Sequence, residues 1–471
     1  MTKKDFSLML ENIGDKYIVE AYAYVESHKR KFIPKRWIAL AACIILIAAA
    51  FPIGIMLENS GWFTPVGTGP ITTAPTVVTD PPPSHVHEWG KWSLIRMATA
   101  SEGGLEERVC ECGEKETNAF PLGSEGLEYK LKENETNEII ITGIGTCTDT
   151  SLSIPTYING YRVVEIGENA FKDSSKLLAV SFPYGIVSIG NSAFYECKSL
   201  KRITLPNGII KIDEKAFALC QSLESLILPE SLRIIGKHSF YGCKSVKDIR
   251  VPSGIEEFGI GVFAACTSLK SVVIECRLSA IPEKTFSGCS NLQDITIPEG
   301  IQSIEKNAFE RCTSLSYIKF PKSLQSIGEM AFNGCTALLD LEIHSGITSI
   351  GINAFIWCSR LKSVTLHGGI TLIGEAAFFE CGALESVILE EGISSVSPHA
   401  FKSCPKLKSI NIPSTLKEIP TAMLSKCIHL QNINFNGTIA EWRAVVKNGS
   451  WDYATADYVI HCTDGDIKKG E

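Results

Sequence analysis

Phenylalanine recurs every 23 residues from position 171 onwards, and this fixed period constrains the fold more than any other feature of the chain. The column runs from Phe171 to Phe401 without an insertion, and the next step reaches Leu424. A cysteine stands three residues beyond this column in eleven consecutive repeats, from Cys197 to Cys427. A constant period of this length with regularly spaced leucine and isoleucine is typical of a solenoid of stacked coils.

Each repeat also contains a short alternating segment that predicts a strand. Leu200, Ile203 and Leu205 are apolar, and Pro206 ends the segment because proline cannot donate to a ladder. One coil cannot bury its own apolar face, so the coils must stack. The sequence therefore predicts an α/β-type repeat solenoid, a right-handed leucine-rich array of about twelve 23-residue coils with short parallel strands.

The cysteine column admits several chemical interpretations, of which core packing is favoured. Catalysis needs one activated thiol rather than eleven equivalent ones, and zinc needs ligands that converge. Neighbouring coils bring cysteines near disulfide distance, but an unbroken column gives no preferred pairing. Because a free cysteine behaves as a small buried hydrophobe, we expect this column to lie in the core beside the phenylalanines.

The N-terminal region contains a candidate membrane anchor. Residues 37–57 form an uncharged run of 21, which is long enough to span a bilayer. Basic residues precede it, whereas the first basic residue after it is Lys91, so the N-terminus is expected in the cytoplasm and the repeats outside. A lipobox-like "LAAC" ending at Cys43 leaves lipoprotein processing as an alternative.

Between this run and the repeats lie a spacer rich in proline and threonine and a segment expected to be a small β module. That segment carries His85, His87, Cys110 and Cys112, which could hold zinc, although the C-x-C spacing is tighter than the usual C-x2-C. Surface histidines and a free thiol pair are the alternative. The expected segments are 1–36 (cytosolic leader), 37–57 (transmembrane helix), 58–84 (spacer), 85–122 (small β module), 123–170 (N-terminal cap and first irregular coil), 171–437 (solenoid) and 438–471 (C-terminal cap).

Composition and motifs exclude several classes of function. The net charge of −7 argues against a general nucleic-acid binder, which normally presents a basic face. The chain has no G-x-S-x-G, H-E-x-x-H or phosphate-binding loop, so we expect neither an enzyme nor a cofactor.

The stretch that begins "EGLEYKL" and continues through "TGIGTCTDTSLSIPTYINGYRVVEIGENAF" into the coils resembles BspA-type leucine-rich repeat proteins of bacterial surfaces. The tail "GTIAEWRAVVKNGSWDYATADYVIHCTDGDI" is similar to the closing segment of such arrays, so the likeness covers about residues 124–466. The resemblance implies an exported, surface-held protein that takes part in attachment. Residues 1–36 faintly resemble the cytosolic leaders of membrane-bound anti-sigma proteins, so the alternative is a transmembrane sensor whose leader holds a regulator such as a sigma factor.

An extracellular protein or glycan is the expected partner, bound non-covalently along the strands. The candidate contacts are side chains at the outward strand positions of the middle coils: Arg202, Asp248, Arg250, Asp294, Tyr317, Lys319, Asp340 and Glu342. His344, His367 and Glu390 replace proline in three consecutive coils, which makes them weak candidates for a metal site. Substitution by ordinary polar residues at an exposed turn is the simpler explanation.

Overall fold

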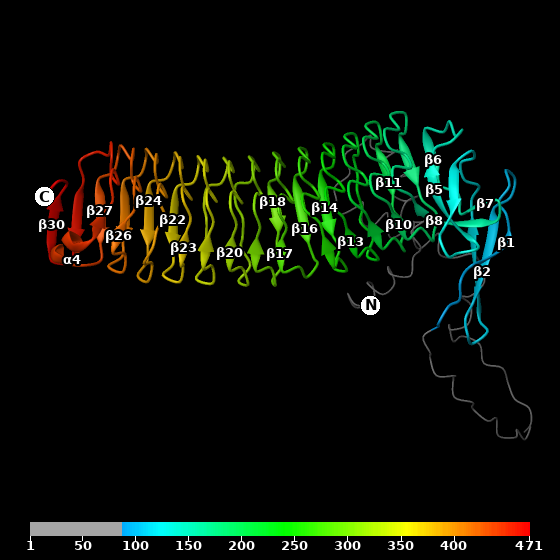
Figure 1. The fold of residues 1–471 in the computed structure, drawn as a ribbon, viewed down its shortest axis with the longest axis horizontal. Helices are drawn as coiled ribbons and strands as arrows, with labels where there is room; N and C mark the ends of the chain where they lie inside the picture. The colour runs from blue at the N-terminus through cyan, green and yellow to red at the C-terminus, as the bar shows by residue number, and fades with distance from the viewer. Residues whose placement is uncertain (1–86) are drawn as a thin grey trace, which may run out of the picture. The chain divides into compact units, whose positions relative to one another are not determined.

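The computed structural model describes residues 87–471, which form a long stack of coils with a small antiparallel sheet at its N-terminal end (Figure 1). The predicted leader, transmembrane segment and spacer lie outside the described residues, as does His85. Between residues 87 and 471, no helix combines the length and the apolar character needed to cross a bilayer.

Two rows of parallel strands run along the stack. One row has strands of three or four residues that end near the proline turn: β6 (Ser151–Ser153), β9 (Ala179–Ser181), β11 (Arg202–Thr204), β14 (Asp248–Val251), β16 (Ser271–Ile274), β18 (Asp294–Thr296), β22 (Ser363–Leu366), β24 (Ser386–Leu389), β25 (Ser409–Ile412), β27 (Asn432–Phe435) and β29 (Val459–Cys462). We call the outward side of this row the long-strand face. The turn that follows requires glycine where the backbone is left-handed, as at Gly300 with φ of 106°.

The second row consists mainly of two-residue strands, and its outward side is the short-strand face. Its members are β10 (Ser188–Ile189), β12 (Lys211–Ile212), β13 (Ile234–Ile235), β15 (Glu257–Phe258), β17 (Ala280–Ile281), β19 (Ser303–Ile304), β20 (Ser326–Ile327), β21 (Ser349–Ile350), β23 (Leu372–Ile373), β26 (Glu418–Ile419) and β28 (Val446–Lys447). The remaining elements lie at the two ends: β1 (Ser93–Arg96), β2 (Gly104–Val109), β3 (Lys115–Phe120), β4 (Glu128–Leu131), β5 (Glu138–Gly143), β7 (Tyr157–Ile158), β8 (Tyr161–Ile166), α4 (Ile439–Ala444) and β30 (Gly465–Lys468).

The register between regular coils never slips. Asp248 pairs with Ser271, and Ser386 pairs with Ser409, so each partner lies 23 residues further along. The 23-residue period of the sequence is therefore also the pairing register of the parallel strands.

The phenylalanine column forms a continuous stack of rings in the core. Successive rings from Phe171 to Phe401 lie 5.0–6.0 Å apart between centroids, with planes inclined by only 2–19°. Each side chain is at most 1% exposed. The rings therefore supply much of the apolar surface that holds neighbouring coils together.

The cysteine column lies beside the rings, which confirms the packing prediction. All eleven cysteines from Cys197 to Cys427 are at most 1% exposed and none is in a disulfide. The structure adds a polar role, because each thiol donates to the carbonyl oxygen of the phenylalanine in the preceding coil at 3.1–3.4 Å. Cysteine thus fills a small space and also links consecutive coils through the backbone.

A left-handed residue stands two positions before and two positions after each phenylalanine of the column. In one coil, Lys215 (φ 54°) and Leu219 (φ 62°) flank Phe217. The N–H groups of these three residues donate to the next coil at 2.9, 2.6 and 2.8 Å for Lys215, Leu219 and Phe217, respectively. A left-handed conformation costs a non-glycine residue about 1–2 kcal/mol, and these inter-coil hydrogen bonds help to offset that cost.

The solenoid continues at both ends beyond the twelve predicted repeats, to about 14 turns. At the N-terminal end, β5 and β8 extend the short-strand row in parallel. At the C-terminal end, β27 pairs with β29, and Ser425 donates to the Ser450 carbonyl at 2.5 Å. The phenylalanine and cysteine columns do not extend into the outermost turns, since no member of either column precedes Phe171 or follows Cys427.

An aromatic cluster closes the C-terminal end of the core. The ring stack stops at Phe401, and beyond it Phe435, Trp442, Trp451 and Tyr458 meet edge to face at 5.2–6.2 Å. Edge-to-face contacts let bulky rings cover the last coil without a further repeat.

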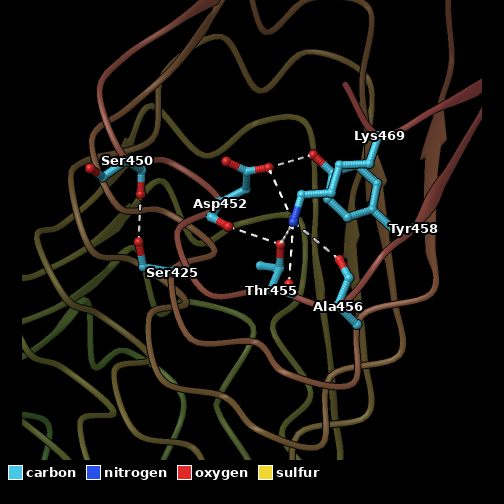
Figure 2. Close-up of polar contacts among 7 residues, drawn as sticks. All are labelled: Ser425, Ser450, Asp452, Thr455, Ala456, Tyr458 and Lys469. Atoms are coloured by element: carbon cyan, nitrogen blue, oxygen red, sulfur yellow. Dashed lines mark hydrogen bonds and ion pairs between the residues drawn. The ribbon is translucent and has the colours of Figure 1, made fainter. Parts of the chain in front are cut away.

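Polar contacts hold the C-terminal tail beside Tyr458 of this cluster (Figure 2). The Lys469 ammonium donates to the Thr455 carbonyl and hydroxyl oxygens and to the Ala456 carbonyl at 3.2, 2.8 and 3.3 Å. The Tyr458 hydroxyl donates to Asp452 at 2.8 Å, and burial raises the pKa of this tyrosine. The last coil is thus covered by a tail whose polar groups are hydrogen-bonded, and its apolar surface is not left exposed to solvent.

A buried carboxylate helps to attach the antiparallel sheet β1–β3 to the first coils. Glu106 of β2 is 0% exposed and accepts from Asn118 and Tyr157 at 2.8 Å each. The Arg162 guanidinium of β8 lies 3.3 Å from the same carboxylate. A fully buried charge requires such partners to compensate for its lost hydration.

We expect Glu106→Gln to destabilise this junction by about 1–3 kcal/mol, because it leaves the Arg162 charge without its partner. Glu107→Gln on the same strand is the matched control, since Glu107 makes an ion pair with the exposed Lys115. Hydrogen exchange in β1–β3 should accelerate in the first variant only. Equal exchange in both variants would contradict the anchoring role.

Candidate binding surface

The eight candidate contact residues all lie exposed on the long-strand face. Arg202 belongs to β11, Asp248 and Arg250 to β14, and Asp294 to β18. The other four occupy the equivalent positions of two coils that form no strand on this face: Tyr317, Lys319, Asp340 and Glu342. Parallel strands lie about 4.8 Å apart, so these residues are spread along the stack and do not converge on a pocket.

Two of the eight residues belong to polar clusters. Arg250 donates to Glu275 through Nε and Nη2 at 2.8 and 2.5 Å, and to Glu230 through Nη1 at 2.5 Å. Hydrogen bonds that Arg250 donates to Glu275 and Glu230 raise its pKa. Asp248 accepts from Ser271 at 2.6 Å. Exposed ion pairs add little stability, so the main effect is to hold the guanidinium in a defined orientation.

Sequence analysis missed the apolar members of this surface. The side chain of Ile227 is 77% exposed, and Val273 and Ile388 are each 39% exposed. They occupy the same repeat position as Arg250 and Glu342, so an apolar residue at an outward strand position was the signal available in the sequence. We call one group of neighbouring residues the Arg250 patch: Ile227, Glu230, Asp248, Arg250, Val273 and Glu275.

His344, His367 and Glu390, the weak candidates for a metal site, already make polar contacts within the protein. His344 Nε2 lies 2.8 Å from the Pro321 carbonyl, and its Nδ1 accepts from the Gly346 N–H at 3.1 Å. His367 Nδ1 lies 2.9 Å from Glu390. Both ring nitrogens of His344 are therefore engaged, and a metal ion shared by the three residues would have to displace these contacts.

The structure does bring three of the four candidate zinc ligands together. Among residues 87–471, His87, Cys110 and Cys112 form the one group of three or more His, Cys, Asp or Glu ligand atoms close enough to share a metal ion. Cys110 is buried and Cys112 is exposed. The backbone N–H of Cys112 lowers the pKa of Cys110 to about 7.

Comparisons with known proteins agree with the repeat architecture. Residues 164–293, 279–408 and 354–446 match the model for the BspA type leucine rich repeat region. No curated protein matches the chain.

Solved structures of bacterial leucine-rich repeat proteins are also similar. One from Bacteroides ovatus has 25% identity and a TM-score of 0.50, and the match covers 71% of this chain and 98% of that chain. One from T. pallidum has 33% identity and a TM-score of 0.38, covering 40% and 88%. A leucine rich cell surface protein from Faecalibacterium prausnitzii has 25% identity and a TM-score of 0.41, covering 70% and 98%.

Proposed function

Because the chain belongs to the BspA-type leucine-rich repeat family, we propose that it is a membrane-anchored extracellular protein that binds a protein or glycan non-covalently along its long-strand face. The observation that carries this proposal is the row of exposed side chains that the strict register repeats along the stack. Solenoids of this kind serve as binding scaffolds because the strand surface is extended and tolerates substitution at outward positions.

The Arg250 patch is the proposed centre of this surface. Its exposed isoleucine lies in the same repeat column as an arginine held by two carboxylates. Protein interfaces combine apolar anchors with oriented arginine, and a few such residues carry most of the binding energy. The mixed charge favours a polar protein partner or a glycan over nucleic acid.

A binding screen tests the function directly. The full chain, displayed on cells, is presented to purified matrix proteins, to a glycan array and to other cells. We expect saturable binding to one of these classes. Absence of binding to every class, with correctly folded protein on the surface, would contradict the proposal.

Anchoring is proposed from the uncharged run at residues 37–57 and the basic residues before it. Protease added to intact cells should therefore remove the repeats and leave residues 1–36 protected. A mature chain carrying a lipid on Cys43 would instead establish the lipoprotein alternative.

A further inference from the structure

The turn between β2 and β3 places two thiols beside the segment that enters the first strand. Gly113 closes the turn with φ of 88°, and the Cys110 N–H donates to the Glu114 carbonyl at 2.8 Å. Trp89 forms an isolated antiparallel bridge with Cys110. This bridge brings His87, two residues earlier, alongside the turn.

The ligand atoms have separations that suit a small tetrahedral ion. One ring nitrogen of His87 and the Sγ atoms of Cys110 and Cys112 all lie within 4.8 Å of one another. Cys112 Sγ lies 3.4 Å from His87 Nδ1. Tetrahedral zinc, with bonds of about 2.3 Å to sulfur and about 2.0–2.1 Å to nitrogen, separates these atoms by about 3.6 Å. We propose that His87, Cys110 and Cys112 form a zinc site.

The surroundings of the imidazole favour Nδ1 as the ligand nitrogen. With Nδ1 facing Cys112, Nε2 lies 3.7 Å from a Glu114 carboxylate oxygen. A metal-bound histidine commonly directs its other ring nitrogen to a carboxylate, which fixes the ring and its tautomer. The His87 ring also stacks on Trp89, with centroids 5.1 Å apart and planes inclined by 28°.

The donor set selects the metal. Two thiolates and an imidazole suit zinc, whereas calcium and magnesium prefer oxygen ligands. Zinc binds with three protein ligands when water takes the fourth position. The site therefore differs from the row at His344, where both ring nitrogens already have partners.

A structural role follows from the small core of this sheet. Within β1–β3, Gly104, Glu106 and Phe120 are the buried residues, and one of them is a carboxylate. Small sheets with little apolar burial are commonly reinforced by a metal or a disulfide. Zinc would join the β2–β3 turn to the segment that enters β1 and so stabilise this small sheet.

Zinc titration of the reduced full chain, with a chromogenic chelator as competitor, tests the proposal. We expect one zinc per chain that His87→Gln and Cys112→Ser each weaken at least tenfold. Cys147→Ser is the matched control, since it removes a partly buried free thiol elsewhere and should leave binding unchanged. Cobalt(II) should give thiolate charge-transfer absorption in the wild type, which Cys112→Ser reduces.

Two results would overturn the site. One is zinc binding that is equal in the wild type and both variants, since the metal would then be bound elsewhere. The other is a Cys110–Cys112 disulfide in the protein isolated from cells without reductant, detected as two protected thiols by alkylation and mass spectrometry. His87→Gln leaves both cysteines of the β2–β3 turn in place. Weaker zinc binding in this variant would therefore come from the lost ligand and not from a disrupted turn.

Discussion

The free energy of unfolding should fall steeply as the pH rises above about 8.5, because the cysteine column must stay protonated in the folded state. Burial raises the pKa of Cys266 and Cys335 to about 12, whereas an unfolded thiol titrates near its ordinary value of about 8.5. The folded state thus keeps protons that the unfolded state releases. The stabilisation from these protonated thiols is fully present below the pKa of the unfolded state, and it is lost as the pH rises towards the pKa of the folded state.

The effect is large because the same environment recurs. Each buried thiol contributes a loss of about 1.4 kcal/mol per pH unit between these two values. Burial raises the pKa of ten members of the column: Cys220, Cys243, Cys266, Cys289, Cys312, Cys335, Cys358, Cys381, Cys404 and Cys427. The loss adds over all the coils that unfold together.

Urea denaturation between pH 8 and pH 10.5, in the presence of a phosphine reductant, measures this dependence. Other groups also titrate in this range, so Cys289→Ala supplies the comparison. This variant should be less stable near pH 7 by about 1–2 kcal/mol, because it leaves a small cavity. The slope of its unfolding free energy against pH should be smaller by the contribution of one proton. An unchanged slope would contradict the linkage between the cysteine column and stability.

Phe286→Ala should destabilise the middle of the array by about 3–5 kcal/mol. The Phe286 ring is 0% exposed and stacks between Phe263 at 6.0 Å and Phe309 at 5.5 Å. Its removal opens a cavity and breaks two inter-coil contacts together. Since each coil contacts only its neighbours, the loss should separate the unfolding of the two halves.

Denaturation followed by circular dichroism and hydrogen exchange tests this expectation. Phe286→Leu keeps most of the volume and should cost less than about 1.5 kcal/mol. Tyr317→Ala removes an exposed aromatic side chain and should change stability by less than about 0.5 kcal/mol. Equal losses in Phe286→Ala and Tyr317→Ala would show that the ring stack does not hold the coils together.

The 23-residue period was sufficient to predict the coil, the core columns and the outward strand positions. Every Phe and Cys column residue repeats at one register, so its burial could be inferred from the sequence alone. The thiol-to-carbonyl hydrogen bonds could not be inferred, because they depend on where the previous coil places its phenylalanine carbonyl. The left-handed residues were also hidden, since Lys215 and Leu219 are not residues that favour this conformation.

Features that occur only once in the chain were harder to predict than those that every coil repeats. Ile227 stands in the same column as Arg250, but an isoleucine in a strand more often indicates a buried side chain than an exposed one. The anchoring of Glu106 by Tyr157 and Arg162 joins segments more than 50 residues apart, and no periodicity relates them. The zinc candidates His85, His87, Cys110 and Cys112 could be named from the sequence, but only the folded turn shows that His87 lies close to both cysteines.

A comparison of partner binding by two matched surface variants tests most directly whether the long-strand face is the binding surface. Ile227→Asp places a charge in the Arg250 patch, whereas Leu372→Asp makes the same kind of change on the short-strand face, where Leu372 is 49% exposed. Binding of the full chain to the partner class found in the screen should weaken at least tenfold in Ile227→Asp and stay unchanged in Leu372→Asp. Undiminished binding by Ile227→Asp, or an equal loss in Leu372→Asp, would contradict the account.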